Sequence, residues 1–291
     1  MVKFTVIGGN ASRDLAKRIA RRLKATYVGT QTKIFPDGES KITFGRIPKK
    51  STVIVVQSTY PPVDTNLLQA LSIISEARKS SSKIYAIIPY MGYARQDKQF
   101  LGGEVITMSI VAKMIKMAGA KKAIFVDIHS KTALNHFKIP KENVSAIPEL
   151  AKYFKKMKLT NPLVVSPDLG GSLRAKKFAS LLNTDFVALK KSRDRNTGKV
   201  QIQSSKADVR GRDLVVIDDI ISTGGSVVKA TQFLKRQKCK RVFVACTHGL
   251  FIGDAVKKIK KAGVSQIIST NTIPGNTSKV DVSGVIVESI Q

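Results

Sequence analysis

The segment VVIDDIISTGGS places two adjacent carboxylates and a glycine turn between an apolar run and an amphipathic stretch. Gly224 and Gly225 let a ligand approach the backbone closely, and a helix that begins near Ser226 would point its first amides at an anion. Asp218 and Asp219 would repel a phosphate at short range but can accept hydrogen bonds from vicinal hydroxyls a few ångströms away. Hydroxyl donors come from Ser222, Thr223 and Ser226. The segment therefore predicts a sugar-phosphate site; the structural alternative is a strand-to-helix turn with aspartate caps.

Polar residues in three further motifs follow predicted strands, at the strand ends where open α/β sheets bind their ligands. Arg95 and Gln96 lie in a glycine-containing loop, and the planar guanidinium of an arginine suits phosphate. Asp168, in the turn SPDLGG, can give a metal ion an oxygen ligand. His129 ends the strand segment VDIHS; because Mg²⁺ prefers oxygen ligands, this histidine is either a hydrogen-bonded strand-end residue or a metal ligand.

Two polar segments each allow a structural and a functional interpretation. FPDGE, at 35–39, is a good turn sequence, and its residue types alone favour a plain turn and a binding segment equally. The stretch from 190 to 213 is polar, strongly basic and poor in apolar anchors. It predicts a mobile loop with a short hairpin around Val200 to Ile202, which is either a solvated charged surface or a cover for the sugar-phosphate site.

Short apolar runs alternate with amphipathic stretches along the whole chain, which predicts alternating strands and helices. The expected helices are Leu15 to Leu23, Leu67 to Ala77, Ile106 to Met117, Leu173 to Leu182, Val227 to Leu234 and Ala255 to Lys261. Apolar strands joined by helices predict parallel sheets that are covered on both faces.

The two halves of the chain resemble each other. STVIVVQSTYPPVDT aligns with RDLVVIDDIISTGGS, so that Gln57 matches Asp218 and Thr65 matches Ser226. An internal duplication explains this match. The first copy lacks the acidic pair and the glycine loop, so a ligand site at this place in the fold is expected in the second copy only.

The length of 291 residues suits two domains of similar size. Pro140 and Pro148 flank a polar connection, which puts the boundary between 138 and 150 and predicts domains of 1–145 and 146–291. The final segment VSGVIVESI is expected to form a strand, which either belongs to the second domain or packs back on the first.

The formal net charge of +30 is typical of proteins that bind nucleic acids by releasing phosphate counterions. The Lys and Arg residues are nevertheless spread along the whole chain, and the sequence has no zinc-ligand spacing, RNP-type motif or tryptophan. This distribution argues against direct nucleic-acid binding. A solvated basic surface, adaptation to a salty or hot interior, and attraction of polyanionic substrates such as nucleotides remain as explanations.

The sequence also indicates in which cellular compartment the protein is expected. No uninterrupted apolar run approaches the roughly 20 residues that span a bilayer, and residues 1–9 predict a buried strand rather than a secretory signal. Cys239 and Cys246 lie near and inside a predicted buried strand, which argues against a disulfide framework and against a cysteine metal site. A cytoplasmic protein without membrane contact is expected.

Several motifs, in order and over nearly the full length, carry a resemblance to a known family. They are FPDGE at 35–39, PYMGYARQD at 89–97, VDIHS at 126–130, SPDLGG at 166–171, the loop of Asp218 to Ser226, and THG at 247–249. The loop alone resembles type I phosphoribosyltransferases and phosphoribosyl pyrophosphate synthetases alike, but the complete set resembles the synthetases. The resemblance implies two tandem type I phosphoribosyltransferase-like domains, each an α/β domain with a mostly parallel sheet flanked by helices.

The resemblance also implies an activity. The family transfers the β,γ-diphosphoryl unit of ATP to the C1 hydroxyl of ribose 5-phosphate, which yields phosphoribosyl pyrophosphate and AMP, with Mg²⁺ as cofactor. ATP and ribose 5-phosphate are therefore the expected partners. The adenine segment often comes from a neighbouring subunit, so at least a homodimer is expected.

The roles implied for single residues follow the motifs. On the ATP side, Phe35 would stack on adenine, Asp37 and Glu39 would recognise its edge, and Gly38, Arg95 and Gln96 complete the set. His129 and Asp168 would bind the metal ion shared with ATP. Lys191 and Arg193 would be the catalytic pair, with Lys190 as the candidate if the alignment slips by one. Ribose 5-phosphate would be bound by Arg193, Asp218, Asp219, Ser222, Thr223, Gly224, Gly225 and Ser226.

The loop departs from the family pattern at two positions. Many members carry Asp where this chain has Ser222 and Thr where it has Ser226, so the site has one negative charge fewer. Two other functions fit the loop: a phosphoribosyltransferase that acts on a base, and a catalytically silent regulator that binds phosphoribosyl ligands. The presence of Lys191, Arg193, His129 and Asp168 argues against silence, because a regulator does not need a cationic lid and a metal site.

Overall fold

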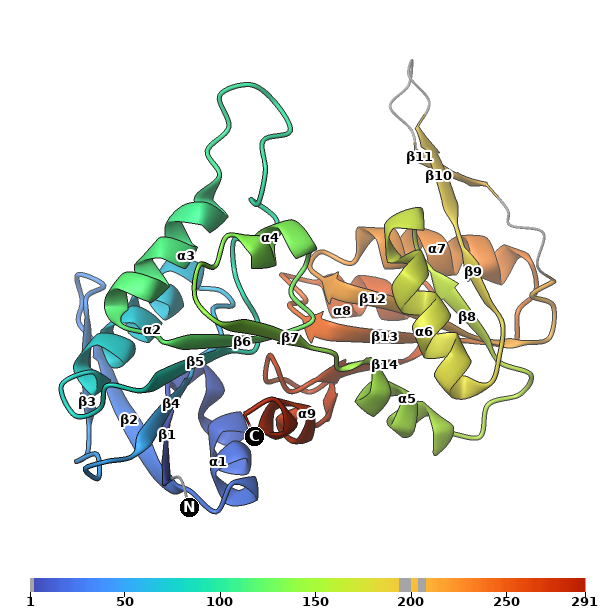
Figure 1. The fold of residues 1–291 in the computed structure, drawn as a ribbon. Coiled ribbons are helices and arrows are strands. Elements are labelled where there is room, and N and C mark those ends of the chain that lie inside the picture. Colours follow the sequence, from blue (N-terminus) through green and yellow to red (C-terminus); the bar gives the residue numbers. More distant parts are fainter. Residues whose placement is uncertain (1–2, 194–199, 204–207, 291) are drawn as a thin grey trace. The chain divides into compact units, whose positions relative to one another are not determined.

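A computed structural model of the chain describes residues 3–193, 200–203 and 208–290. The chain forms two compact units (Figure 1). Unit 1 comprises Met1–Ser145, Thr272–Pro274 and Asp281–Gln291, and unit 2 comprises Ala146–Asn271 and Gly275–Val280. The expected second domain of 146–291 therefore differs from unit 2 at its C-terminal end, where residues 281–291 belong with the first part of the chain.

Unit 1 is built on a seven-stranded sheet in which only one neighbouring pair is antiparallel. Its order is β3 (Ser40–Phe44), β2 (Thr26–Ile34), β1 (Phe4–Gly8), β4 (Thr52–Val56), β5 (Ile84–Ile88), β6 (Lys122–Val126) and β7 (Lys141–Val144). The central strand β4 is buried throughout, as expected for a parallel strand covered on both faces. The helices are α1 (Arg13–Arg22), α2 (Val63–Ala77), α3 (Thr107–Ala118), α4 (Lys131–Asn135) and α9 (Ser283–Glu288).

Unit 2 has a six-stranded sheet whose strands are all parallel. Its order is β15 (Ser278–Val280), β14 (Val264–Thr270), β13 (Arg241–Gly249), β12 (Asp213–Ile221), β8 (Leu163–Ser166) and β9 (Phe186–Ala188). The helices are α5 (Ile147–Lys155), α6 (Ser172–Leu182), α7 (Gly225–Arg236) and α8 (Ala255–Lys261). The expected fold class of two mostly parallel α/β units is confirmed.

A separate hairpin extends the chain beyond β9 (Figure 1). Strand β10 (Lys190–Arg193) pairs antiparallel with β11 (Val200–Gln203), so the expected hairpin around Val200 to Ile202 is present. Residues 194–199 and 204–207 of the predicted mobile loop lie outside the described residues.

The strand orders of the two units support the internal duplication. Reading across each sheet, β2-β1-β4-β5-β6-β7 of unit 1 corresponds to β9-β8-β12-β13-β14-β15 of unit 2. In both units a helix joins the first two strands, α1 in one and α6 in the other. The strand that precedes Gln57 and the strand that contains Asp218 therefore occupy the same place in their sheets.

The C-terminal segment forms a helix, so the expectation of a strand was wrong. Its buried residues include Val282, Ile286 and Ile290, which recur at the four-residue interval of a helical face. Helix α9 contacts α1, where the Nε of Arg22 donates a hydrogen bond to the hydroxyl of Ser283 at 2.8 Å. Burial against another element thus outweighs the strand preference of the β-branched residues in this segment.

Candidate functional site

The acidic pair and the glycine turn lie at the carboxyl end of β12. The strand does not stop at the two carboxylates but continues to Ile221, and α7 begins at Gly225. Gly224 precedes the helix with a φ of 75°, a left-handed conformation that glycine adopts without strain. Thr223 and Gly225 are exposed, so the start of α7 lies at the protein surface. This is the geometry expected of an anion site.

The two carboxylates are partly withdrawn from solvent. The side chain of Asp218 is 20% exposed and that of Asp219 is 9% exposed. The backbone N–H of Asp219 donates to Asp218 Oδ1 at 2.9 Å, and the N–H of Ile220 donates to Asp219 Oδ1 at 2.9 Å. These bonds fix one oxygen of each carboxylate.

Arg174, which the sequence analysis did not single out, joins the pair. Its NH1 lies 3.2 Å from Asp218 Oδ1 and its NH2 lies 3.2 Å from Asp219 Oδ2. Arg174 is on the first turn of α6, and α6 follows β8, the sheet neighbour of β12. A signal was present in the sequence, because an arginine three residues after SPDLGG lies where such a helix must begin.

The pKa of Asp218 is raised to about 7. The main cause is burial and the second is the neighbouring Asp219 carboxylate, while the Arg174 guanidinium lowers the pKa. Cys246 lies opposite Asp218 on β13 and is fully buried. Burial, together with the two carboxylates, raises the pKa of the Cys246 thiol well above its usual value, so this cysteine stays protonated.

Asp168 lies in the turn between β8 and α6. Its Oδ1 accepts a hydrogen bond from the N–H of Gly171 at 3.2 Å, and its backbone carbonyl accepts one from the hydroxyl of Ser166 at 2.7 Å. The carboxylate is thus held in the turn in which the sequence predicted a metal ligand. Its role as a ligand stays a prediction.

His129 follows β6 in unit 1 and is exposed. It comes two residues after Asp127, whose φ of 39° is unusual for a residue with a side chain, and such backbone strain gathers at functional sites. His129 and Asp168 belong to different units. In the part of the chain that the structure describes, no three His, Cys, Asp or Glu side chains form a metal cluster. Either side chain alone would leave most of the coordination of a Mg²⁺ ion to phosphate oxygens and waters.

The FPDGE segment is the turn of the β2–β3 hairpin. The N–H of Gly38 donates to the carbonyl of Phe35 at 2.9 Å, and the N–H of Glu39 donates to Asp37 Oδ1 at 3.1 Å. Asp37, Gly38 and Glu39 are exposed, and the Nζ of Lys33 lies 5.1 Å from the centre of the Phe35 ring. The segment therefore forms a turn, which fits both interpretations, and adenine binding by this turn stays a prediction.

Arg95 and Gln96 are exposed on the loop after β5, and the next residue ties this loop to the His129 segment. The buried Asp97 carboxylate accepts a hydrogen bond from the hydroxyl of Ser130, which also caps α4. The Nε2 of His136 lies 2.7 Å from the carbonyl of Asp97. Arg95 and Gln96 thus lie on a loop that is bonded to the loop of His129, the candidate metal ligand of unit 1. Nothing in the local sequence of either loop indicates this connection.

Lys191 and Arg193 are both on β10, where they pair with Ile202 and Val200 of β11. Their side chains lie outside the described residues, so their catalytic role stays a prediction. Lys190, the alternative candidate, is exposed at the start of the same strand.

The corresponding place in unit 1 is filled by neutral groups. Gln57 Oε1 accepts from the N–H of Ala11 at 3.1 Å, and Gln57 Nε2 donates to Asn66 Oδ1 at 3.2 Å. The N–H of Ser58 donates to the hydroxyl of Ser12 at 2.8 Å. A Cβ on Gly9 would come within 2.1 Å of Gln57 Oε1, so this side chain occupies the space at the strand end. Unit 1 lacks the chemistry of the sugar-phosphate loop, as the sequence indicated.

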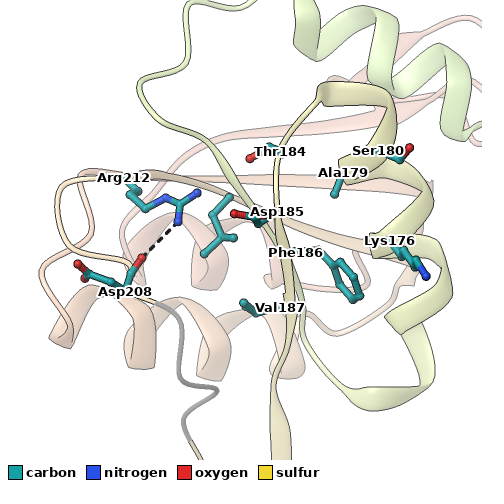
Figure 2. Close-up of a pocket in the computed structure, with 10 residues that line it drawn as sticks. Lys176, Ala179, Ser180, Thr184, Asp185, Phe186, Val187, Asp208 and Arg212 are labelled. Carbon is teal, nitrogen blue, oxygen red and sulfur yellow. Dashed lines mark hydrogen bonds between the residues drawn. The ribbon is translucent and has the colours of Figure 1, made fainter.

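Unit 2 also has a pocket of about 540 Å³ beside β9 and α6 (Figure 2). Its polar lining includes Lys176, Asp185 and Arg212, and the Arg212 guanidinium is bonded to the carbonyls of Asn161 and Pro162. The residues that line it include none of the predicted site residues, so this pocket is separate from the candidate site.

Comparison with known proteins agrees with this arrangement. Residues 4–119 match the N-terminal domain of ribose phosphate pyrophosphokinase, and residues 141–283 match the phosphoribosyl transferase domain. The chain is 37% identical over 285 residues to the ribose-phosphate pyrophosphokinase of Sulfurisphaera tokodaii, with 96% of this chain and 97% of that protein covered. It is 38% identical over 286 residues to the ribose-phosphate pyrophosphokinase of Sulfolobus acidocaldarius, with the same coverage of 96% and 97%.

A solved structure matches across both units. The phosphoribosylpyrophosphate synthetase from Mycobacterium smegmatis superposes with a TM-score of 0.86 at 28% identity, covering 99% of this chain and 97% of that one. Together with the acidic pair and glycine turn of unit 2 and the lack of both in unit 1, these matches show that the chain belongs to the ribose-phosphate pyrophosphokinase family.

Proposed function

We propose that this protein transfers the β,γ-diphosphoryl group of ATP to the C1 hydroxyl of ribose 5-phosphate, giving phosphoribosyl pyrophosphate and AMP. The observation that carries the proposal is the pairing of Asp218 and Asp219 with the exposed N-terminus of α7. The helix end suits a phosphate and the carboxylates suit vicinal hydroxyls, and a ribose phosphate presents both groups. Membership in the family names the reaction that such a site would serve.

On the sugar side, the amides of Gly225 and Ser226 would bind the 5-phosphate, together with the hydroxyls of Ser222, Thr223 and Ser226. Asp218 and Asp219 would accept hydrogen bonds from the ribose hydroxyls. Ser222 can donate a hydrogen bond to phosphate where an aspartate would repel it. The replacement of the family's usual Asp at this position is therefore compatible with phosphate binding.

On the ATP side, Phe35, Asp37, Gly38 and Glu39 would form the adenine segment, and Arg95 and Gln96 would contact the nucleotide. Support comes from the exposure of the turn and of both loop side chains. Asp97 would keep the loop in place through its bond to Ser130. The exposed Arg95 would then meet a phosphate from a loop that is bonded to the His129 segment.

His129 and Asp168 would hold Mg²⁺ together with oxygens of the substrates. When bound, the ion would neutralise charge on the phosphates of ATP. Asp168 fits this role because its carboxylate is positioned in the turn by Gly171. Lys191 and Arg193 would stabilise the negative charge that builds up on the departing AMP and on the transferred group.

At least a homodimer is the proposed active unit. An apolar stripe on α3 supports this proposal: Ile110, Met114 and Met117 are 47%, 37% and 77% exposed and recur at helical spacing. Such a stripe on a surface helix is typical of an interface. A second copy of the chain would cover it and could bring its own FPDGE turn to the adenine.

The decisive experiment is to incubate the purified protein with ATP, Mg²⁺ and ribose 5-phosphate and to separate the nucleotides. Release of AMP that depends on ribose 5-phosphate, without ADP, is expected. Formation of ADP, or release of AMP without the sugar, would contradict the proposed reaction. A base added together with phosphoribosyl pyrophosphate tests for base transfer, and no nucleotide product is expected.

A further inference from the structure

We propose that Arg174 is the positioning residue of the sugar site, and that its guanidinium holds Asp218 and Asp219 side by side as acceptors for two neighbouring hydroxyls of the sugar. This inference rests on the proposed function. It deepens that function by explaining how two adjacent acidic side chains can serve one ligand.

The guanidinium of Arg174 bridges the carboxylates of Asp218 and Asp219 with its two terminal nitrogens. NH1 of Arg174 lies 3.2 Å from Asp218 Oδ1, and NH2 lies 3.2 Å from Asp219 Oδ2. The planar guanidinium fixes the distance between its two nitrogens, so it also fixes the spacing of the two acceptors. The side chain of Arg174 is only 21% exposed, which makes this a partly buried network and not a surface ion pair.

The turn before α6 leaves space for this guanidinium because residue 171 is a glycine. A Cβ on Gly171 would come within 3.3 Å of Arg174 NH1 and within 2.5 Å of the Ser166 hydroxyl. Any larger residue at 171 would push against both groups. The glycine therefore provides the room through which Arg174 reaches the end of β12.

The other unit of the chain serves as an internal comparison. There the turn before α1 faces Gln57 and Ser58 with neutral groups only, the N–H of Ala11 and the hydroxyl of Ser12. Gln57 and Ser58 take the places of Asp218 and Asp219 in the repeat. The unit with neutral residues at the strand end has neutral partners, and the unit with the acidic pair has an arginine. In this chain the guanidinium thus accompanies the acidic pair and is absent from the described contacts of Gln57 and Ser58.

The chemistry explains why the acidic pair needs a cation. Two adjacent carboxylates in a partly buried site disfavour each other's ionised form, and a protonated carboxyl donates a hydrogen bond where the sugar needs an acceptor. Asp219 raises the pKa of Asp218 and Arg174 lowers it. Two titratable residues of the neighbouring strand β13 lie close by: Cys246 lies opposite Asp218 and its raised pKa keeps it neutral, and the buried His248 lies opposite Ile220. Arg174 is therefore the group that favours two ionised acceptors.

The test uses three variants of the full chain. Arg174→Met removes the charge and keeps the length, Arg174→Lys keeps the charge but cannot bridge two carboxylates, and Lys177→Met changes an exposed lysine on the same helix. Binding of ribose 5-phosphate is measured by calorimetry, and the KM values for both substrates and the turnover are measured by AMP release. For Arg174→Met we expect affinity for ribose 5-phosphate to fall about tenfold or more, with the KM for ATP changed less than about twofold. Arg174→Lys should lie between Arg174→Met and the native protein, and Lys177→Met should match the native protein.

The pH profile separates positioning from a merely structural role. Loss of the guanidinium should move the acid limb of kcat/KM for ribose 5-phosphate to higher pH, by about one unit or more, because the neighbouring cation no longer favours the ionised form. Arg174→Met with native affinity and a native pH profile would overturn the proposal. If Arg174→Met does not fold, an Arg174→Lys variant with native affinity and profile would overturn it equally. If the native protein binds ribose 5-phosphate but releases no AMP, the proposed reaction fails while the binding measurements still decide the role of Arg174.

Discussion

Gly224 packs directly against Ile259 of α8, so closely that a Cβ on the glycine would lie 2.8 Å from Ile259 Cδ1. The left-handed backbone at Gly224 adds a second reason for glycine. The sugar-phosphate turn is therefore fixed by packing against a helix as well as by its own conformation.

Gly224→Ala should reduce the free energy of unfolding by about 1 to 3 kcal/mol, because it adds both backbone strain and an overpacked contact. Urea unfolding followed by circular dichroism measures this change. The matched control is Gly225→Ala, where a Cβ would meet only the Thr223 hydroxyl at 4.0 Å. Equal losses in both variants would contradict the argument from Ile259.

Asp218→Asn should raise the KM for ribose 5-phosphate far more than the KM for ATP. The amide is close to the carboxylate in shape but is a weaker acceptor, and it offers donors where the sugar hydroxyls need partners. Steady-state kinetics with each substrate varied in turn gives both constants. Asp208→Asn, an exposed aspartate on the same unit, is the control. A similar rise in both KM values would argue against Asp218 as a sugar ligand.

The same variant should change stability in a pH-dependent way. The folded-state pKa of Asp218 is about 7, above the value of about 3.9 expected in the unfolded chain. Ionised Asp218 therefore destabilises the native state above pH 7, and this penalty fades as the pH falls from 7 towards 4. Asp218→Asn should be more stable than the native protein by about 1 kcal/mol or more at pH 8, and the two should converge near pH 4. Denaturant melts at four or five pH values measure the difference, and a constant difference would contradict the raised pKa.

Lys191→Ala and Arg193→Ala should each lower turnover by about 10³-fold or more, with smaller effects on the KM values. Cations at a phosphoryl-transfer centre act mainly on charge that develops in the transition state. Lys190→Ala distinguishes the two alignments of this segment, because it should have little effect if Lys191 is the catalytic lysine. Nearly native turnover with raised KM values in both alanine variants would make the pair a binding clamp instead.

Met114→Lys should weaken self-association, since it puts a charge in the middle of the apolar stripe on α3. Sedimentation at assay concentration is expected to show a smaller species than the native protein, with reduced AMP release. Lys113→Gln, an exposed position on the same helix, is the control. A native protein that sediments as a fully active monomer would refute the proposed dimer.

The local signals in the sequence predicted much of the site. The apolar run, the adjacent aspartates and the glycine turn are continuous in the chain, so their strand, loop and helix could be predicted without knowing the fold. Arg174 could not be predicted in the same way, because its partner Asp218 is 44 residues away and the contact depends on β8 lying beside β12. The bond between Asp97 and Ser130 was missed for the same reason, since it joins the ends of neighbouring strands.

The C-terminal segment shows where residue preference fails. Its valines and isoleucines favour a strand, but their spacing matches a helical face, and contact with α1 decides between the two. The expected domain range of 146–291 followed from a single break in the chain, and a single break could not reveal that residues 281–291 return to unit 1.

This return of the chain has a consequence for protein synthesis. Helix α9 belongs to unit 1 but leaves the ribosome only after every strand of unit 2 has been made. Domains that fold during translation usually fold in order from the N-terminus to the C-terminus. Unit 1 can therefore be completed only after unit 2 has been synthesised. A stop codon just before Asp281 would leave all of unit 2 intact while removing part of unit 1.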